Sequence, residues 1–125
     1  MKKKYLLLFC ILLSFFPNAY SQLSDLHYLP PLKQVTNNQA VRNQAFYLST
    51  PETIPFTVEV FEGASTTPVT VLVVSNAVPI KYDLGDGDNN ISLVTNANTG
   101  IVLSNSGLRF QAAGGQKFYV NYRGR

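Results

Sequence analysis

Hydrophobic and polar residues alternate along much of the chain after residue 40, in short segments separated by turn residues. Residues 56–60 follow a strict apolar–polar alternation, which predicts a strand with one buried face and one wet face. Residues 69–75 are apolar at nearly every position, which predicts a central strand covered on both faces. The same criteria indicate further strands at residues 40–48, 80–84, 90–95, 101–103, 108–112 and 117–123.

No segment beyond residue 22 repeats its apolar residues with a helical period, so the pattern favours an all-β fold. Strands at this spacing, joined by Gly, Asn and Pro turns, are typical of sandwiches and barrels. We therefore expect residues 39–125 to form an antiparallel β-sandwich, immunoglobulin-like or jelly-roll-like. The last expected strand runs almost to the final residue, Arg125, without a following linker, which favours a sandwich truncated at its C-terminus.

Residues 22–38 depart from this pattern and are expected to form an extended leader ahead of the sandwich. Pro30 and Pro31 fix an extended backbone and lack the N–H groups that a sheet ladder needs. A polar break at residues 37–39 separates this segment from the first expected strand of the sandwich.

The first 21 residues have the three parts of a secretory signal peptide, whose apolar part is expected to be helical. Lysines occupy positions 2–4, residues 5–16 are apolar apart from one serine, and small residues stand at Ala19 and Ser21. We place the cut between Ser21 and Gln22. The apolar stretch is too short for a membrane-spanning helix, which needs about 20 residues.

Removal of the signal peptide changes the composition of what remains. The whole chain has 10 Lys and Arg against 7 Asp and Glu, a formal net charge of +3, and three of the lysines lie in the signal. Residues 22–125 therefore carry seven charges of each sign, so a nucleic-acid partner is not expected.

Cys10 is the only cysteine. A lipid anchor on it is disfavoured by the preceding Phe9, and without it the exported part has no disulfide or thiolate ligand. An exported part without cysteine is typical of a bacterial protein rather than of a small eukaryotic secreted domain.

Residues 84–90, Leu-Gly-Asp-Gly-Asp-Asn-Asn, are the most chemically suggestive stretch. Asp86, Asp88 and Asn90 alternate as calcium ligands do at the start of an EF-hand loop. The glycine and glutamate that such a loop needs later are replaced by Ile91 and Ala97. Asp-Gly pairs are also typical of hairpin turns, because they supply residues with positive φ. We favour the turn, expect no cofactor, and keep calcium as the alternative.

Catalytic constellations are not evident. His27 is the only histidine, and its position in the proline-flanked leader favours a solvated side chain over a triad or zinc site. No serine or threonine has an evident base, and no glycine-rich phosphate loop opens a helix. We therefore expect a protein without enzymatic activity.

Aromatic and arginine side chains near the end of the chain offer one candidate binding face. These residue types are enriched in interfaces. Ordinary strand residues, with one face packed and one wet, account for the same pattern and are the favoured interpretation. The residues concerned are Arg109, Tyr119, Tyr122 and Arg123.

Several stretches together resemble the amino-terminal region of very large exported proteins of gliding Bacteroidetes-type bacteria. They are QLSDLHYLPPL (22–32), YLSTP (47–51), LGDGDN (84–89), TGIVL (99–103), SGLRF (106–110) and KFYVNYRG (117–124). Residues 48–84 are also similar to modules of the IgG-Fc-binding-protein type. Proteins of this kind carry repeated immunoglobulin-like or PKD-like modules and end in a sorting domain for type IX secretion.

The resemblance implies a secreted or cell-surface protein of a Gram-negative bacterium, whose amino-terminal β-sandwich acts in adhesion or as a structural module. Its ligand would be a protein or a glycan, and no stable membrane span remains after signal cleavage. This chain lacks the repeats and the sorting domain, so surface retention by type IX secretion is not implied for it. Two alternatives remain open: an accessory domain of a secreted hydrolase, and a truncated fragment with no independent function.

Overall fold

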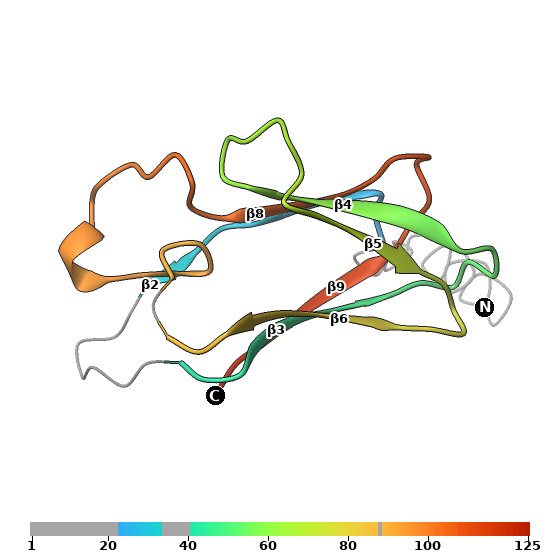
Figure 1. Ribbon diagram of the computed structural model, residues 1–125, viewed down its shortest axis with the longest axis horizontal. Coiled ribbons are helices and arrows are strands. Elements are labelled where there is room, and N and C mark those ends of the chain that lie inside the picture. The colour runs from blue at the N-terminus through green and yellow to red at the C-terminus, as the bar shows by residue number, and fades with distance from the viewer. Residues whose placement is uncertain (1–22, 34–40, 88) are drawn as a thin grey trace, which may run out of the picture.

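The computed structural model describes residues 23–33, 41–87 and 89–125, which form two sheets packed face to face (Figure 1). The larger sheet has the order β1 (Leu26–Leu29), β8 (Leu108–Ala112), β4 (Phe56–Glu62), β5 (Thr70–Val74). The smaller sheet has the order β6 (Ile80–Gly85), β3 (Gln44–Ser49), β9 (Tyr119–Arg123). Neighbouring strands in both sheets are antiparallel. The expected antiparallel β-sandwich is confirmed.

Most connections pass from one sheet to the other. In the two main sheets only β4 and β5 are consecutive strands that also pair with each other. The first strand, β1, lies beside β8, whereas the first two strands of an immunoglobulin constant domain are neighbours. At one end of the sandwich β2 (Leu32–Lys33) and β7 (Leu93–Val94) form a short parallel pair, followed by the 3-10 turn η1 (Asn96–Asn98).

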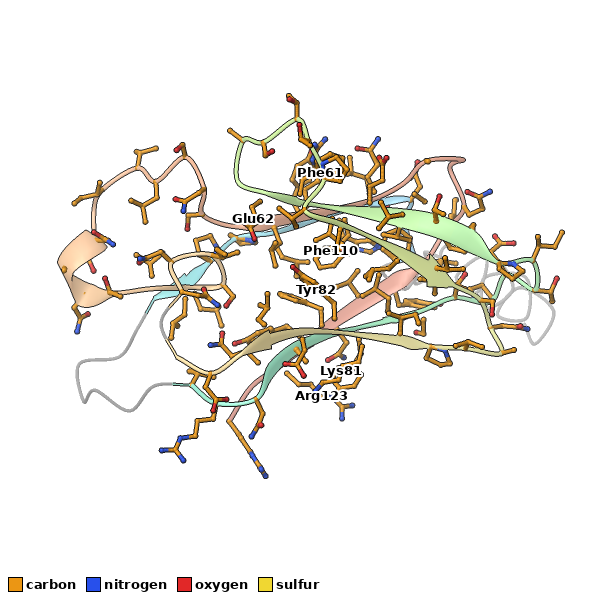
Figure 2. The ribbon with its side chains drawn as sticks, viewed as in Figure 1. Phe61, Glu62, Lys81, Tyr82, Phe110 and Arg123 are labelled. Atoms are coloured by element: carbon orange, nitrogen blue, oxygen red, sulfur yellow. The ribbon has the colours of Figure 1, made fainter. Side chains whose placement is uncertain are left out.

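The core lies between the inner faces of the two sheets. The alternation of residues 56–60 buries Phe56, Val58 and Val60, as the sequence predicts. Phe110 is fully buried at the centre, with its ring centroid 5.2 Å from Phe46 and 6.2 Å from Tyr82. Tyr82 points from the smaller sheet toward Phe110 of the larger one (Figure 2). These aromatic contacts join the two layers.

Two expectations about strands are wrong. Residues 69–75 were expected to form a central strand, but β5 is the edge of its sheet, and Val71 and Val73 are 50% and 56% exposed. The inward face of β5 meets the opposite sheet, whereas its outward valines remain about half exposed. Residues 101–103 form no strand. By contrast, the expected strand at residues 108–112 has the observed bounds of β8.

Part of the expected leader belongs to the sandwich. Leu26–Leu29 forms β1 and pairs with β8 along its whole length, so the sheet begins before the two prolines. The prolines end β1 because they cannot donate to a ladder, but they do not prevent the residues before them from pairing. The expected signal peptide at residues 1–21, its cleavage site at Ser21 and Gln22, and leader residues 34–38 lie outside the described residues.

Candidate functional site

An open groove beside β1 and β8 combines aromatic, basic and hydroxyl side chains. Its volume is about 490 Å³. We call it the β1–β8 groove. It is lined by Tyr28, Leu29, Pro30, Pro31, Gly63, Ser106, Gly107, Leu108 and Arg109.

Sheet register places the two most prominent side chains of the groove on one face. Tyr28 lies opposite Arg109 in the β1–β8 pairing, and directly opposed residues of antiparallel strands share a face. Tyr28 is 69% exposed, so its ring is presented to solvent.

Arg109 is held in a fixed orientation by three neighbours. Its guanidinium carbon lies 3.9 Å from the centroid of the Phe61 ring, which is a cation–π contact. Its Nη1 donates to Gln111 Oε1 at 3.2 Å, and its Nη2 to the Ser65 carbonyl at 3.4 Å. Phe61 lies on the outer side of the sheet and is nevertheless buried (Figure 2). These three contacts place the guanidinium at the wall of the groove.

Ser106 adds a hydroxyl group to the groove. Its Oγ is buried and has no hydrogen-bond partner among the described residues. Buried polar groups are nearly always hydrogen-bonded in proteins, so this hydroxyl beside the groove is an unused hydrogen-bonding group among the described residues. The adjacent backbone is tied down, because Gly107 donates to Ile91 at 2.8 Å and Gly63 donates to Gly107 at 2.9 Å.

A second, smaller cavity of about 190 Å³ lies at the end of the sandwich, between β1 and the smaller sheet. Its lining is mostly apolar and shares Leu29, Pro30 and Leu108 with the groove. The polar exceptions, Ser92 and Tyr122, have their hydroxyl groups bonded to Gln44. The full lining is Leu29, Pro30, Leu32, Phe46, Ser92, Leu108 and Tyr122.

Gln44 is fully buried and is the centre of a hydrogen-bonded cluster that the sequence pattern did not predict. Its Nε2 donates to the Gly87 carbonyl at 2.6 Å and to that of Val41 at 3.4 Å. Its Oε1 accepts from Ser92 Oγ at 2.6 Å and from Tyr122 OH at 3.0 Å. A signal was present: Gln44 occupies an inward position of β3, in step with the buried residues two and four positions later.

The hydroxyl groups of Ser92 and Tyr122 make structural hydrogen bonds. Ser92 Oγ contacts amide oxygens, those of Gln44 at 2.6 Å and Asn89 at 3.2 Å, and an amide oxygen is not a base. His27 belongs to β1, where its Nε2 donates to the Phe118 carbonyl at 2.8 Å and its ring meets that of Phe118 at 4.7 Å. The expectation of a solvated His27 is therefore wrong, and this imidazole ties β1 to the segment before β9.

The calcium alternative concerned Asp86, Asp88 and Asn90. Asp86 Oδ1 accepts the backbone N–H of Asn43 at 2.6 Å, while Asn90 Oδ1 accepts from Asn98 Nδ2 at 3.0 Å. Asp88 lies outside the described residues. Within the described part of the chain, no three His, Cys, Asp or Glu side chains come together in a metal-binding group.

The described residues on either side of Asp88 bend sharply, as Asp-Gly pairs predict. Gly85, Gly87 and Asn90 have φ values of 77°, 93° and 59°. The bend is not a hairpin, because β6 pairs with β3 whereas β7 pairs with β2. It redirects the chain from the smaller sheet toward the end of the sandwich.

The four residues of the other candidate face are not brought together. Arg109 belongs to the larger sheet and Arg123 to the smaller one, where its guanidinium carbon lies 5.3 Å from the Tyr47 ring centroid. Tyr122 points into the sandwich, with its ring 5.1 Å from Phe46, and Tyr119 pairs with Ser49 at the start of β9. Arg109 alone of the four lines the β1–β8 groove.

The described residues form a β-sandwich with an open, partly aromatic groove beside β1 and β8. Comparison with known proteins finds no matching family model, no matching curated protein and no matching solved structure. None of the described residues belongs to a helix long and apolar enough to cross a membrane.

Proposed function

We propose that this protein is a non-enzymatic binding or structural module of an exported, adhesin-like protein, and that it holds a protein or glycan ligand in the β1–β8 groove. The observation that carries the proposal is the combination in that groove of an exposed tyrosine ring, a fixed guanidinium and an unsatisfied hydroxyl. These belong to Tyr28, Arg109 and Ser106.

Each of the three groups supports binding for a separate physical reason. Tyrosine and arginine are the residue types that most often dominate binding energy. Arg109 is pre-ordered by Phe61, Gln111 and Ser65, so little side-chain freedom is lost when a ligand contacts it. The leucine and proline walls provide apolar surface around a few polar groups, which is the usual composition of ligand sites.

The sequence supports export rather than an internal location. Residues 1–21 have the three parts of a secretory signal, so the proposed place of action is the exterior or cell surface of a Gram-negative bacterium. The proposal requires neither a cofactor nor calcium. Catalysis is not proposed, because His27 and Ser92 are engaged in structural hydrogen bonds.

The test is an array of glycans and extracellular proteins probed with the purified protein and two tyrosine variants. Y28A removes the exposed ring of the groove, and Y47A removes a 40% exposed tyrosine from the opposite sheet as the matched control. We expect specific binding that falls at least about tenfold in Y28A, since an anchoring aromatic side chain contributes 2 kcal/mol or more. Y47A should bind as the unaltered protein does.

The outcome can contradict the proposal in two ways. Equal binding by Y28A and the unaltered protein would remove the groove as the ligand site. Absence of specific binding to any glycan or protein on the array would count against a binding module and leave only the structural role. S106A, which changes one hydroxyl, measures whether Ser106 contributes to ligand binding.

A further inference from the structure

The two main sheets end in four terminal strands, β1, β5, β6 and β9, which differ in how far they are protected against pairing with another strand. β1 is ended by Pro30 and Pro31. β6 carries the exposed ion pair Lys81–Asp83, and β9 carries Arg123. Prolines and charges at an edge are common means by which proteins prevent edge-to-edge association.

β5 is less protected, because it has no charge along its length and the nearest proline, Pro68, lies two residues before its first residue. Its sequence, Thr-Val-Leu-Val-Val, contains no charge and no proline. Val71 and Val73 are 50% and 56% exposed on the outer face, and Val69, just before the strand, is 48% exposed. In the described part of the chain β5 pairs only with β4, so the backbone groups on its other side are open to a further strand (Figure 1).

We propose that β5 pairs with β5 of a second copy of this chain, antiparallel and about a two-fold axis at Leu72, so that the two larger sheets become one. In this arrangement Leu72 lies opposite its own copy, Val71 lies opposite the Val73 of that copy, and Thr70 lies opposite its Val74. Each copy contributes the same surface, as in the commonest class of homodimer.

Register is fixed by two physical requirements. Side chains of paired antiparallel residues share a face, so the outward valines of one copy must oppose the outward valines of the other. Backbone N–H and C=O groups point to alternate sides of a strand, so residues whose groups face the open edge must also oppose each other. Both conditions are met when the two-fold axis lies at Leu72, and with this axis every residue of β5 has a partner in β5 of the other copy. A shift of one residue violates both.

Charge favours a second copy as the occupant. β5 carries no charged group that could select a charged peptide, and the self-paired strands bring no like charges together. Residues 22–125 carry seven basic and seven acidic residues, so two copies of that segment are not repelled by net charge. The two-fold pairing uses the β5 edge of both copies and is closed by its own symmetry, so it yields a dimer rather than a fibre.

The test is sedimentation of the purified protein over a range of concentrations, with three variants. V71K/V73K places lysine opposite lysine across the proposed axis, whereas V71K/V73E places each introduced lysine opposite an introduced glutamate of the other copy. T57K is the matched control, because Thr57 is an exposed neighbour on the same outer face but lies in β4 rather than at the edge. Circular dichroism verifies that each variant is folded.

We expect a concentration-dependent dimer for the unaltered protein and for T57K. V71K/V73K should weaken dimerisation at least about a hundredfold, and V71K/V73E should recover at least about tenfold of that loss because opposite charges face each other. An unaltered protein that remains monomeric at its highest soluble concentration would overturn the proposal. Equal dimerisation by V71K/V73K and the unaltered protein, or equal weakening in both charged variants, would also overturn it. These outcomes are independent of ligand binding in the β1–β8 groove.

Discussion

Replacement of Gln44 by leucine tests whether the buried polar cluster stabilises the fold. Q44L keeps a side chain of similar size, so it removes the amide without leaving a large cavity. The amide makes three hydrogen bonds of 3.0 Å or shorter, to Gly87, Ser92 and Tyr122. Each contributes about 1 kcal/mol net, so we expect the free energy of unfolding to fall by about 3 kcal/mol.

The assay is urea denaturation together with thermal unfolding. In a domain of this size 1 kcal/mol corresponds to about 4–8 °C in Tm, so Q44L should lower Tm by at least about 12 °C. Y122F removes only the hydrogen bond from Tyr122 OH to Gln44 Oε1 and should cost about 1 kcal/mol. Because both variants lose that same bond, the double variant should be less destabilised than the sum of the two by about 1 kcal/mol.

Two results would refute this reasoning. A loss of less than about 1 kcal/mol in Q44L would mean that the cluster does not contribute as its hydrogen bonds indicate. Full additivity of Q44L and Y122F would mean that the glutamine and tyrosine are not coupled.

Further predictions concern the core, a loop contact and pH. F110A should lower the free energy of unfolding by about 3–5 kcal/mol in urea titration, because Phe110 is fully buried between the sheets; a loss below 1 kcal/mol would contradict the packing. G63A should lower the free energy of unfolding by about 2 kcal/mol or more, because φ is +52° and a new Cβ would overlap the carbonyl oxygen of Ser104. G85A, where φ is +77° but the space around the new Cβ is open, should lower it less. A larger loss in G85A than in G63A would contradict the overlap. Burial raises the pKa of Tyr82 above the ordinary 10.0, so the folded state holds that proton more tightly. The contribution of Tyr82 to stability is therefore full below pH 10 and is lost as pH rises toward the folded pKa. The free energy of unfolding, measured by urea titration from about pH 8 to about pH 11, should fall less steeply with pH in Y82F. An unchanged pH dependence would contradict this prediction.

The local pattern was sufficient for the class of fold because alternation is a property of neighbouring residues. Strands β4 and β8 were predicted at or near their bounds, since every second residue is apolar and each segment ends at a turn. The Asp-Gly bend after β6 was also predictable from its residues. The bend is not a hairpin, because that depends on which strands β6 and β7 pair with elsewhere.

The candidate site was only partly accessible from the sequence. Arg109 was singled out, but with three residues that the structure places on other faces. Tyr28 was hidden in a supposed leader, because β1 has only four residues and two prolines follow it. Its exposure beside Arg109 depends on the pairing of residues some eighty positions apart, which no short-range pattern encodes.

The sequence by itself therefore determined that this chain is built of β-strands and where most of them lie, and it predicts a signal peptide at residues 1–21. The tertiary structure alone decided the strand order, the membership of β1, the hydrogen-bond partners of Gln44 and the position of β5 at an edge. The physical reason is that alternation tells only that one face of a strand can be buried. Whether a strand is central or terminal depends on which distant segment supplies its hydrogen-bond partners, and for apolar β5 the described chain supplies a partner on one side only.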